Sequence, residues 1–328
     1  MSKLFEPIRI NHLVLNNRLV MPPMATAKAG ANDRVTDEVC DYYRERAKYS
    51  KISLIITEHC YIHPQGKAHP GQVSIATDDA ISGFMKLTNC IHEEGVKVFA
   101  QISHAGTAAK SAVTGQAPVG PSAISHPKQK QELPKEMTRE QIHEVTIWFA
   151  QAARRVKEAG FDGVEIHSAH GYLLNQFFSP IYNHRTDEYG SQSVENRTRF
   201  QREIVQAVRK ETGDDFPIAM RLGGCDYEEG GSTIHDCLEA CQLFEECGVD
   251  LLHLTGGMNG FIRPDHSEPG YFRDMSVPVK QNVKIPVLLT GGVTSISQAE
   301  ALLEDHCADM IGVGRAIYKN AHWADNER

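Results

Sequence analysis

Two histidines and a tyrosine follow the end of one apolar segment. The run Val164–Ile166 is followed directly by His167, His170 and Tyr172. Two imidazoles three residues apart in a tight turn can direct their N–H groups at one acceptor, and a phenol two residues further along can reach the same ligand from another side. The pattern predicts a clamp of hydrogen-bond donors with a proton source beside it.

Two other interpretations of these residues stay open at this stage. The histidines could satisfy buried backbone carbonyls while the tyrosine packs in the core. A metal site built on His-x-x-His is a further alternative, but no Asp, Glu or Cys occurs between His167 and Tyr172 to complete a ligand set. We therefore expect no bound metal.

Gln101 and Arg221 each lie at the end of another apolar segment. A glutamine amide both donates and accepts hydrogen bonds, which suits the polar edge of a pyrimidine-like ring. An arginine stabilises negative charge on such a ring when the ring is reduced. This pair predicts a site for a redox-active heterocycle.

Glycines follow the last two apolar segments of the chain. Gly291, Gly292 and Gly314 lack a Cβ, so backbone N–H groups near them can approach an anion closely, and Arg315 can add a positive charge. These residues predict a phosphate site. Together with the glutamine and arginine above, they describe a site for flavin mononucleotide (FMN).

These residues can meet only if the strands that carry them end at one place. Apolar segments without alternation, typical of strands buried on both faces, are separated by helical patterns about eight times along the chain. No G-x-G-x-x-G follows the first strand, which disfavours a dinucleotide-binding doubly wound sheet. We predict an α/β fold, a (β/α)8 TIM barrel formed as a single domain by residues 1–328, with catalytic groups at the C-terminal ends of its strands.

The boundaries of the predicted elements follow from capping and turn residues. Residues 4–16 alternate around an Asn-His turn and predict a β-hairpin cap, and the last helix, from Ala316 onward, is shortened. Pro22 and Pro23 stop the first barrel strand. The other predicted strands are 52–59, 96–102, 164–166, 217–222, 251–255, 286–290 and 310–313, and the predicted helices are 36–49, 78–94, 138–159, 196–212, 233–247, 277–281 and 297–304.

Composition excludes several classes of protein. The 328 residues carry a formal charge of −8 without a basic cluster, so nucleic acid and anionic membranes are poor partners. The start M-S-K-L-F-E-P lacks the features of a signal peptide, and no apolar run approaches the length of a bilayer span, which predicts a cytoplasmic protein. The eight cysteines are scattered without C-x-x-C, which predicts free thiols and no iron–sulfur site.

The sequence resembles the Old Yellow Enzyme family of FMN-dependent ene-reductases from Leu4 to about Ile317. The motifs that carry the resemblance are N-R-L-V-M-P-P-M, A-Q-I-S-H-A-G (100–106), E-I-H-S-A-H-G-Y-L (165–173), S-P-I-Y-N-H-R-T-D-E-Y-G (179–190), E-N-R-T-R-F (195–200) and G-V-G-R-A (312–316). The H-R-T-D-E-Y-G loop and the His-x-x-His-x-Tyr cluster at barrel spacing make the set specific.

The resemblance implies a role for each candidate residue. His167 and His170 would bind the substrate oxygen and Tyr172 would supply a proton. The residues implied to bind FMN are Pro22, Pro23, Met24 and Ala25 along the ring, His59, Gln101 and Arg221 at its polar edge, and Gly291, Gly292, Gly314 and Arg315 at the phosphate.

The implied reaction is a ping-pong reduction of activated alkenes. NAD(P)H would reduce FMN and leave, and an α,β-unsaturated carbonyl or nitro compound would then enter the same site. The alternatives are an NADH oxidase or another flavin-dependent dehydrogenase of this fold, and a flavin-binding electron-transfer protein without turnover of its own. A flavin-free, metal-dependent barrel hydrolase is a third.

Two positions depart from the family pattern. Ala25 stands where relatives carry a Thr or Cys that hydrogen-bonds the flavin, so redox tuning through that contact is lost. Ala27 stands where some relatives place a substrate-binding Tyr, which implies a wider or more apolar pocket. The resemblance is to short members without the C-terminal iron–sulfur extension of some relatives, and homo-oligomers are common in the family.

Overall fold

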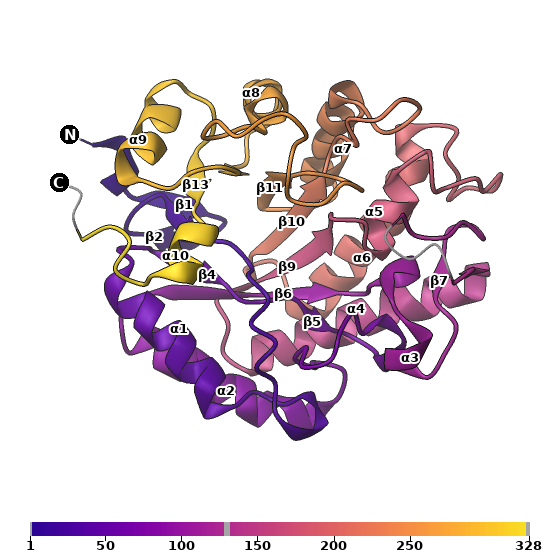
Figure 1. The fold of residues 1–328 in the computed structure, drawn as a ribbon, viewed down its shortest axis with the longest axis horizontal. Helices are drawn as coiled ribbons and strands as arrows, with labels where there is room; N and C mark the ends of the chain where they lie inside the picture. The colour runs from indigo at the N-terminus through magenta and orange to yellow at the C-terminus, as the bar shows by residue number, and fades with distance from the viewer. Residues whose placement is uncertain (1, 128–131, 326–328) are drawn as a thin grey trace.

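The computed structural model describes residues 2–127 and 132–325, so Met1, 128–131 and 326–328 of the predicted single domain lie outside it. Within the described residues, eight parallel strands close into a barrel with helices around it (Figure 1). The predicted (β/α)8 fold is therefore confirmed. The barrel strands are β3 (Leu19–Met21), β4 (Leu54–Ile56), β6 (Lys97–Ser103), β9 (Gly163–Ser168), β10 (Ile218–Gly223), β11 (Leu251–Thr255), β12 (Val287–Thr290) and β13 (Met310–Gly312).

Each strand pairs in parallel with its neighbours, and β4 pairs with β6, which follows it in the ring. The strand registers place β3 beside β13, so the first and last strands of the chain meet and the barrel is closed. Every residue of β9, β10 and β11 is buried, which agrees with apolar segments that do not alternate.

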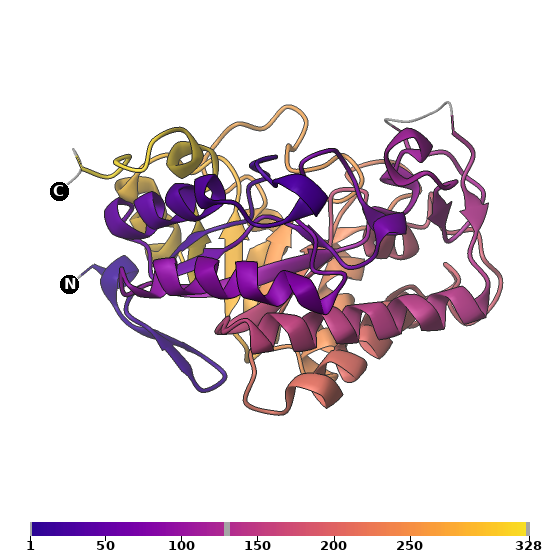
Figure 2. The same ribbon diagram turned by 90° about the horizontal axis from the view of Figure 1, so that it is seen from below.

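Helices follow the strands and cover the outside of the barrel (Figures 1 and 2). The covering helices are α1 (Asp37–Tyr49), α2 (Ile81–His92), α4 (Arg139–Glu158), α6 (Val194–Thr212), α7 (Ile234–Glu246), α8 (Arg273–Asn282), α9 (Ile296–Glu304) and α10 (Arg315–Lys319). Shorter elements in the connections are α3 (Ser111–Thr114), α5 (Leu173–Phe178), β5 (Cys60–Tyr61), β7 (Val119–Gly120), β8 (Lys135–Glu136) and the 3-10 helices η1 (Lys3–Phe5), η2 (Ala31–Asp33), η3 (Pro64–Gly66), η4 (Asp78–Ala80) and η5 (Gly106–Ala108).

Local capping explains where the helices begin. The Thr36 side chain accepts a hydrogen bond from the backbone of Val39 at the start of α1. Thr138 and Gln141 form a reciprocal capping box at the start of α4. Both starts agree with the predicted positions because the capping residues act within one turn of the sequence that they cap.

The predicted hairpin cap is present as β1 (Ile8–Ile10) and β2 (Leu13–Leu15), which pair in antiparallel register. Asn11 adopts φ 51° in the tight turn. Ile10, Leu13 and Leu15 pack in one cluster with residues near the N-terminal ends of the barrel strands, such as Leu54. The hairpin, in indigo in Figure 2, therefore closes the end of the barrel where the strands begin.

Three predicted elements have other bounds in the structure. The strand predicted at Val164–Ile166 extends over Gly163–Ser168, so His167 lies within it and not after it. The predicted strand 52–59 is paired only at Leu54–Ile56, because the chain then turns to bring Glu58 to Thr26, where the two side chains hydrogen-bond. The predicted helix 277–281 extends over Arg273–Asn282 because buried residues before Pro278 pack it against α7 and β12.

Among the described residues, no helix has both the length and the apolar character needed to cross a bilayer. The eight cysteines are free thiols, as predicted.

Candidate active site

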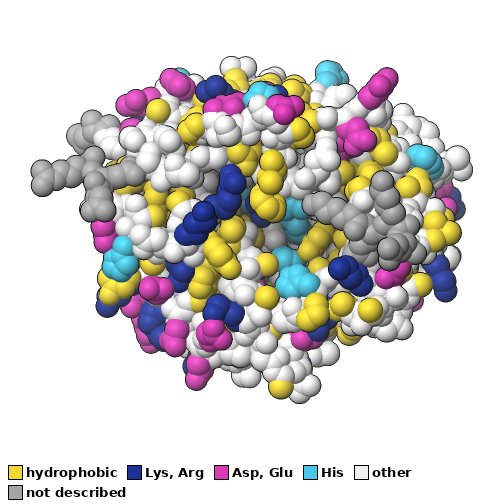
Figure 3. Space-filling model, viewed as in Figure 1, with side chains coloured by type: hydrophobic (Ala, Val, Ile, Leu, Met, Phe, Trp, Pro, Cys, Tyr) yellow, Lys and Arg dark blue, Asp and Glu magenta, His cyan; other side chains and the backbone are white. Residues whose placement is uncertain are grey.

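A cavity of about 360 Å³ opens at the C-terminal ends of the barrel strands. In Figure 3 its mouth is a hollow near the centre of the face, bordered by histidine and hydrophobic side chains with basic side chains to one side. Every candidate residue from the sequence lines this cavity: Pro22, Pro23, Met24, Ala25, His59, Gln101, His167, His170, Tyr172, Arg221, Gly291, Gly292, Gly314 and Arg315. The structure thus gathers them at one place.

A strained turn aims the histidine and tyrosine side chains. Strand β9 ends at Ser168, and His170 and Gly171 both take positive φ, at 59° and 75°. A positive φ is uncommon for a residue with a side chain and costs on the order of 1 kcal/mol or more. The turn carries the chain from the strand into α5, and Tyr172 occupies the N-cap position of that helix. This geometry places the side chains of His170 and Tyr172 at the cavity.

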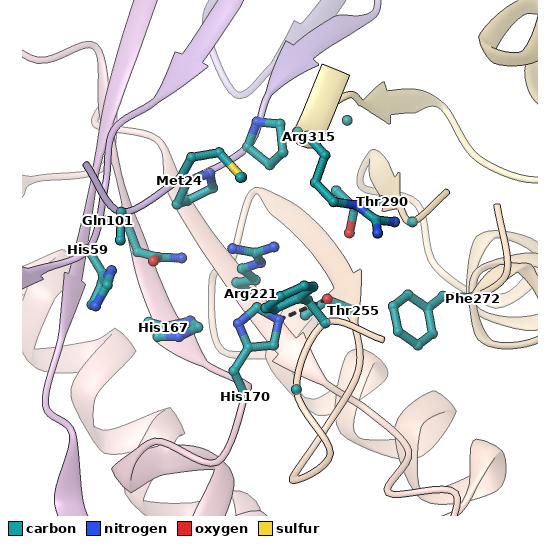
Figure 4. Close-up of a pocket in the computed structure, with 18 of the residues that line it drawn as sticks. Met24, His59, Gln101, His167, His170, Arg221, Thr255, Phe272, Thr290 and Arg315 are labelled. Atoms are coloured by element: carbon teal, nitrogen blue, oxygen red, sulfur yellow. Dashed lines mark hydrogen bonds between the residues drawn. The ribbon is translucent and has the colours of Figure 1, made fainter. Parts of the chain in front are cut away.

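The three rings form one edge-to-face group. The ring centroid of His167 lies 5.2 Å from that of His170 and 5.0 Å from that of Tyr172. In Figure 4 the His170 ring lies between His167 and Thr255, and its Nε2 is 3.0 Å from the Thr255 hydroxyl oxygen. Thr255 thus holds one nitrogen of His170.

Tyr172 has a second imidazole beside it. Its hydroxyl oxygen lies 3.0 Å from Nε2 of His59, at the end of the second barrel strand. Burial lowers the pKa of His59 to about 3, and burial together with nearby positive groups lowers the pKa of His167 well below its ordinary value. Burial raises the pKa of Tyr172 above its ordinary value. At neutral pH the tyrosine therefore keeps its proton, and both imidazoles are neutral.

Arg221 is a buried cation without a direct partner. Its side chain lines the cavity with only 6% of the residue exposed, and within the described part of the chain it makes no hydrogen bond and no ion pair within 4 Å. Burial lowers its pKa to about 10, and the charge of Glu165 acts in the opposite direction. The guanidinium therefore stays charged at neutral pH. A buried cation in this state requires an electron-rich ligand in the cavity.

A buried hydrogen-bond chain lies behind Gln101. The Gln101 side-chain amide donates to one oxygen of Glu165 over 2.7 Å, and Nδ1 of His253 is 2.6 Å from the other oxygen. Glu165 and His253 are both fully buried. Neither residue was predicted from the sequence, although the glutamate inside the apolar run G-V-E-I-H was a usable signal.

The glycine turn after β12 packs against an aromatic ring. Gly291 and Gly292 take φ 121° and 73°, and a Cβ on Gly291 would lie 2.7 Å from the Tyr271 ring. The Tyr271 hydroxyl donates to the carbonyl of Phe261 and lies 3.5 Å from Nη2 of Arg315. Two glycines, a phenol and a guanidinium therefore form one corner of the cavity.

The segment after β3 is fixed by a buried carboxylate. The hydroxyl of Thr26 donates to Glu58 over 2.6 Å, and the Thr26 backbone N–H donates to the other oxygen of that carboxylate. This contact holds Met24 and Ala25 along one wall of the cavity. Ala27 is not among the lining residues; its backbone, at φ 55°, packs against Gly71.

Several lining residues were not predicted: Thr255, Gly260, Phe261, Tyr271, Phe272, Thr290, Val293 and Gly312. Thr255, Thr290 and Gly312 end β11, β12 and β13, so the rule that placed the other residues could have found them. The loop residues 260–272 carry no such signal. Phe261, which is 54% exposed, lies edge-on to His170 with ring centroids 6.2 Å apart.

The whole chain is similar to known proteins. Residues 3–326 match the profile of the NADH:flavin oxidoreductase / NADH oxidase family. The chain is 37% identical over 326 residues to the NADH oxidase of Thermoanaerobacter brockii, covering 98% of this chain and 50% of that protein. It is 38% identical over 324 residues to the NADPH dehydrogenase of Bacillus subtilis, covering 98% of this chain and 93% of that protein.

A solved structure of an old yellow enzyme homologue from Zymomonas mobilis superposes with a TM-score of 0.84 at 28% identity. The match covers 97% of this chain and 90% of that one. The chain spans about half the length of the first curated relatives that it matches.

Proposed function

The chain belongs to the NADH:flavin oxidoreductase / NADH oxidase family, and from this premise we propose that it is an FMN-dependent enzyme that uses NAD(P)H to reduce the C=C bond of activated alkenes. The substrates are small α,β-unsaturated carbonyl or nitro compounds. We also propose that residues 1–328 form one FMN-binding barrel domain. When bound, FMN accepts two electrons from NAD(P)H and passes them to the alkene in a ping-pong reaction.

The unpartnered guanidinium of Arg221 is the observation that carries this proposal. The pyrimidine edge of a flavin presents oxygen and nitrogen acceptors and gains negative charge on reduction, which is the ligand that this buried cation needs. Gln101 lines the same cavity and offers an amide that complements a mixed donor and acceptor edge. These two residues fit the polar edge of the ring, with His59 beside them.

The remaining walls fit the rest of the cofactor. Pro22, Pro23, Met24 and Ala25 form a largely apolar wall suited to the flat ring. At the far corner, the residues that would hold the phosphate are Gly291, Gly292, Gly314 and Arg315. A Cβ on Gly314 would lie within 3.3 Å of the Met24 and Pro22 side chains. Glycine at this position therefore avoids crowding this wall of the cavity.

His167, His170 and Tyr172 act on the substrate. The two imidazoles donate hydrogen bonds to the carbonyl or nitro oxygen and stabilise the negative charge that develops there in the transition state. Thr255 holds the ring of His170 in place through Nε2. Tyr172 delivers a proton to the α-carbon, and its pKa, raised by burial, keeps that proton in place until the carbon becomes basic.

The proposal is tested on the purified protein. A yellow preparation with flavin absorbance near ~450 nm, and NAD(P)H oxidation that accelerates with cyclohexenone in the absence of oxygen, are the expected results. A colourless protein that takes up no added FMN would refute the cofactor assignment and would leave the metal-dependent hydrolase to be examined.

The second candidate function is an NADH oxidase, favoured by the 37% identity to the protein of that name from Thermoanaerobacter brockii. The two candidates differ in the electron acceptor, so the matched measurement is NADH turnover with oxygen alone and with cyclohexenone alone. Turnover with oxygen and none with the enone, at equal flavin content, would select the oxidase. Flavin reduction without turnover by either acceptor would select the electron-transfer protein.

Replacing Arg221 by Ala is expected to lower the flavin midpoint potential and weaken FMN retention. One charge at about 4 Å in an effective dielectric of about 20 contributes on the order of a few kcal/mol before screening. Dye-equilibration titration and FMN release measure the two effects. Arg221→Lys is the matched control, because it keeps the charge and loses the planar fork, so its potential should lie closer to that of the wild type. Wild-type affinity and potential in Arg221→Ala would show that this residue does not contact the flavin.

Replacing Ala25 by Thr adds a hydroxyl to the wall of the cavity that we propose lies along the flavin ring. One added hydrogen bond is expected to shift the midpoint potential by an amount on the order of 1 kcal/mol, or about 20 mV for a two-electron couple. The potential and the rates of both half-reactions are measured on the same preparation. If none of them changes, the side chain at position 25 does not face the flavin.

A further inference from the structure

Glu165 is an anion fixed inside the barrel, directly behind the cavity. It lies in the middle of β9, and its two oxygens face Gln101 and His253 from neighbouring parts of the barrel interior, at 2.7 Å and 2.6 Å. Gln101 donates to one oxygen, and His253 in the tautomer with hydrogen on Nδ1 donates to the other, which is the pattern of an ionised carboxylate. A fully buried anion is costly unless it is hydrogen-bonded and electrically balanced.

The first consequence concerns the orientation of the Gln101 amide. A carboxylate can only accept, so Gln101 must present its nitrogen to Glu165, as it does in the structure. The amide cannot turn over without placing its own oxygen against the carboxylate oxygen. Glu165 therefore fixes which atoms of Gln101 remain for a ligand: the carbonyl oxygen and the second N–H.

The second consequence concerns the charge that the cavity presents. Arg221 has no ion pair within 4 Å among the described residues, and Glu165 is the charged group that acts on it electrostatically. Arg221 on β10 lies opposite His253 on β11 in the strand register, and His253 in turn contacts Glu165. Burial lowers the pKa of His253, so that imidazole adds no charge at neutral pH. The set therefore has one positive and one negative charge.

We propose that Glu165, held by His253, is a positioning residue that fixes the Gln101 amide and offsets the charge of Arg221, and so sets the reduction potential of the bound flavin. This inference rests on the proposed function. Glu165 and His253, which do not line the cavity, would thus influence the reduction potential of the flavin inside it. In the absence of that role, Glu165 and His253 would serve only to fill and hydrogen-bond the barrel core.

The test is the flavin midpoint potential of Glu165→Gln. This change keeps the shape of the side chain and removes its charge, which leaves Arg221 unopposed and favours the reduced, more negative flavin. The equilibrium constant between reduced and oxidised flavin is expected to rise about tenfold, which corresponds to about 30 mV for a two-electron couple. Because the amide of Gln101 is then free to turn, affinity for oxidised FMN is expected to fall as well. Both quantities are measured without turnover.

His253 supplies the matched controls. His253→Asn retains a neutral donor near the position of Nδ1 and should keep the wild-type potential. His253→Leu removes the donor at similar volume, which leaves one Glu165 oxygen without a hydrogen bond and weakens the hold on that side chain. It should raise the potential in the same direction as Glu165→Gln. This second variant carries the test if Glu165→Gln does not fold.

The outcomes separate this inference from the proposed function. A potential equal to that of the wild type in flavin-loaded Glu165→Gln or His253→Leu overturns the inference and leaves the function intact. Variants that only lose thermal stability, at unchanged potential, give the same answer, because a purely structural role predicts that result. A wild-type protein that binds no FMN refutes the proposed function itself.

Discussion

Replacing Tyr172 by Phe is expected to slow enone reduction about 10²–10⁴-fold and to leave reduction of the flavin by NAD(P)H unchanged. The substitution removes one hydroxyl and keeps the ring that packs 5.0 Å from His167. Donation of a proton to carbon is needed only after the alkene has entered. The loss should therefore appear in the oxidative half-reaction alone.

The surroundings of the hydroxyl support this role. Nε2 of His59 lies 3.0 Å from the phenol oxygen, so a neutral imidazole in the tautomer with hydrogen on Nε2 can donate to that oxygen. This leaves the O–H of Tyr172 directed away from His59. It also places a donor where negative charge forms as the proton leaves, which lowers the cost of proton transfer from a group whose pKa is raised by burial.

Stopped-flow measurement of the two half-reactions decides the prediction. Nitroalkenes are the internal control, because a nitronate product is stable enough to leave and take its proton from water, so these substrates should be slowed less than enones. Equal slowing of flavin reduction and enone reduction, or unchanged enone turnover, would show that Tyr172 is not the proton donor.

Much of the fold was readable from the sequence because its signals are local. The Thr138 capping box acts over three residues, and the hairpin cap follows from alternation around Asn11. Catalytic residues of such barrels lie at the C-terminal ends of the strands. This rule alone predicted that residues from seven strands meet at one site, and they line one cavity in the structure. The family resemblance, now supported by the match over residues 3–326, rests on those same motifs.

The contacts that orient the site could not be predicted in this way. Glu165 and His253 are 88 positions apart, and Tyr172 and His59 are 113 positions apart. No periodicity or turn pattern states which of two buried polar groups will face each other across a closed barrel. Such pairings depend on strand register, which the structure supplies and the composition of a single strand does not.

The loop that brings Tyr271 to the glycine turn was missed for a different reason. It lies between β11 and α8, and its path is set by packing on other loops, with Gly270 bonded to the carbonyl of Gly291. Loop paths of this kind are weakly encoded by local sequence. The glycine pair predicted an anion site, but the position of the Tyr271 phenol beside these glycines is known only from the structure.

Replacing either His167 or His170 by Ala is expected to slow the oxidative half-reaction by about 10²–10³-fold and to weaken binding of phenols, which mimic the substrate oxyanion. Each change removes one donor from the clamp, at a cost on the order of 3 kcal/mol in the transition state. Flavin reduction at saturating NAD(P)H should change much less, because the nicotinamide presents no developing oxyanion to the clamp.

Thr255→Val is the matched control for His170. It removes the hydroxyl that lies 3.0 Å from Nε2 and keeps the imidazole, so it tests whether holding the ring matters apart from the donor itself. A partial loss of phenol affinity in Thr255→Val, smaller than in His170→Ala, is the expected result, since a mobile ring still donates part of the time. The rings of His167 and His170 lie 5.2 Å apart and serve one oxygen, so combining Thr255→Val with His167→Ala should give losses that are not additive. Phenol affinity that survives in both histidine variants would place the substrate oxygen elsewhere in the cavity, and the clamp would have to be abandoned.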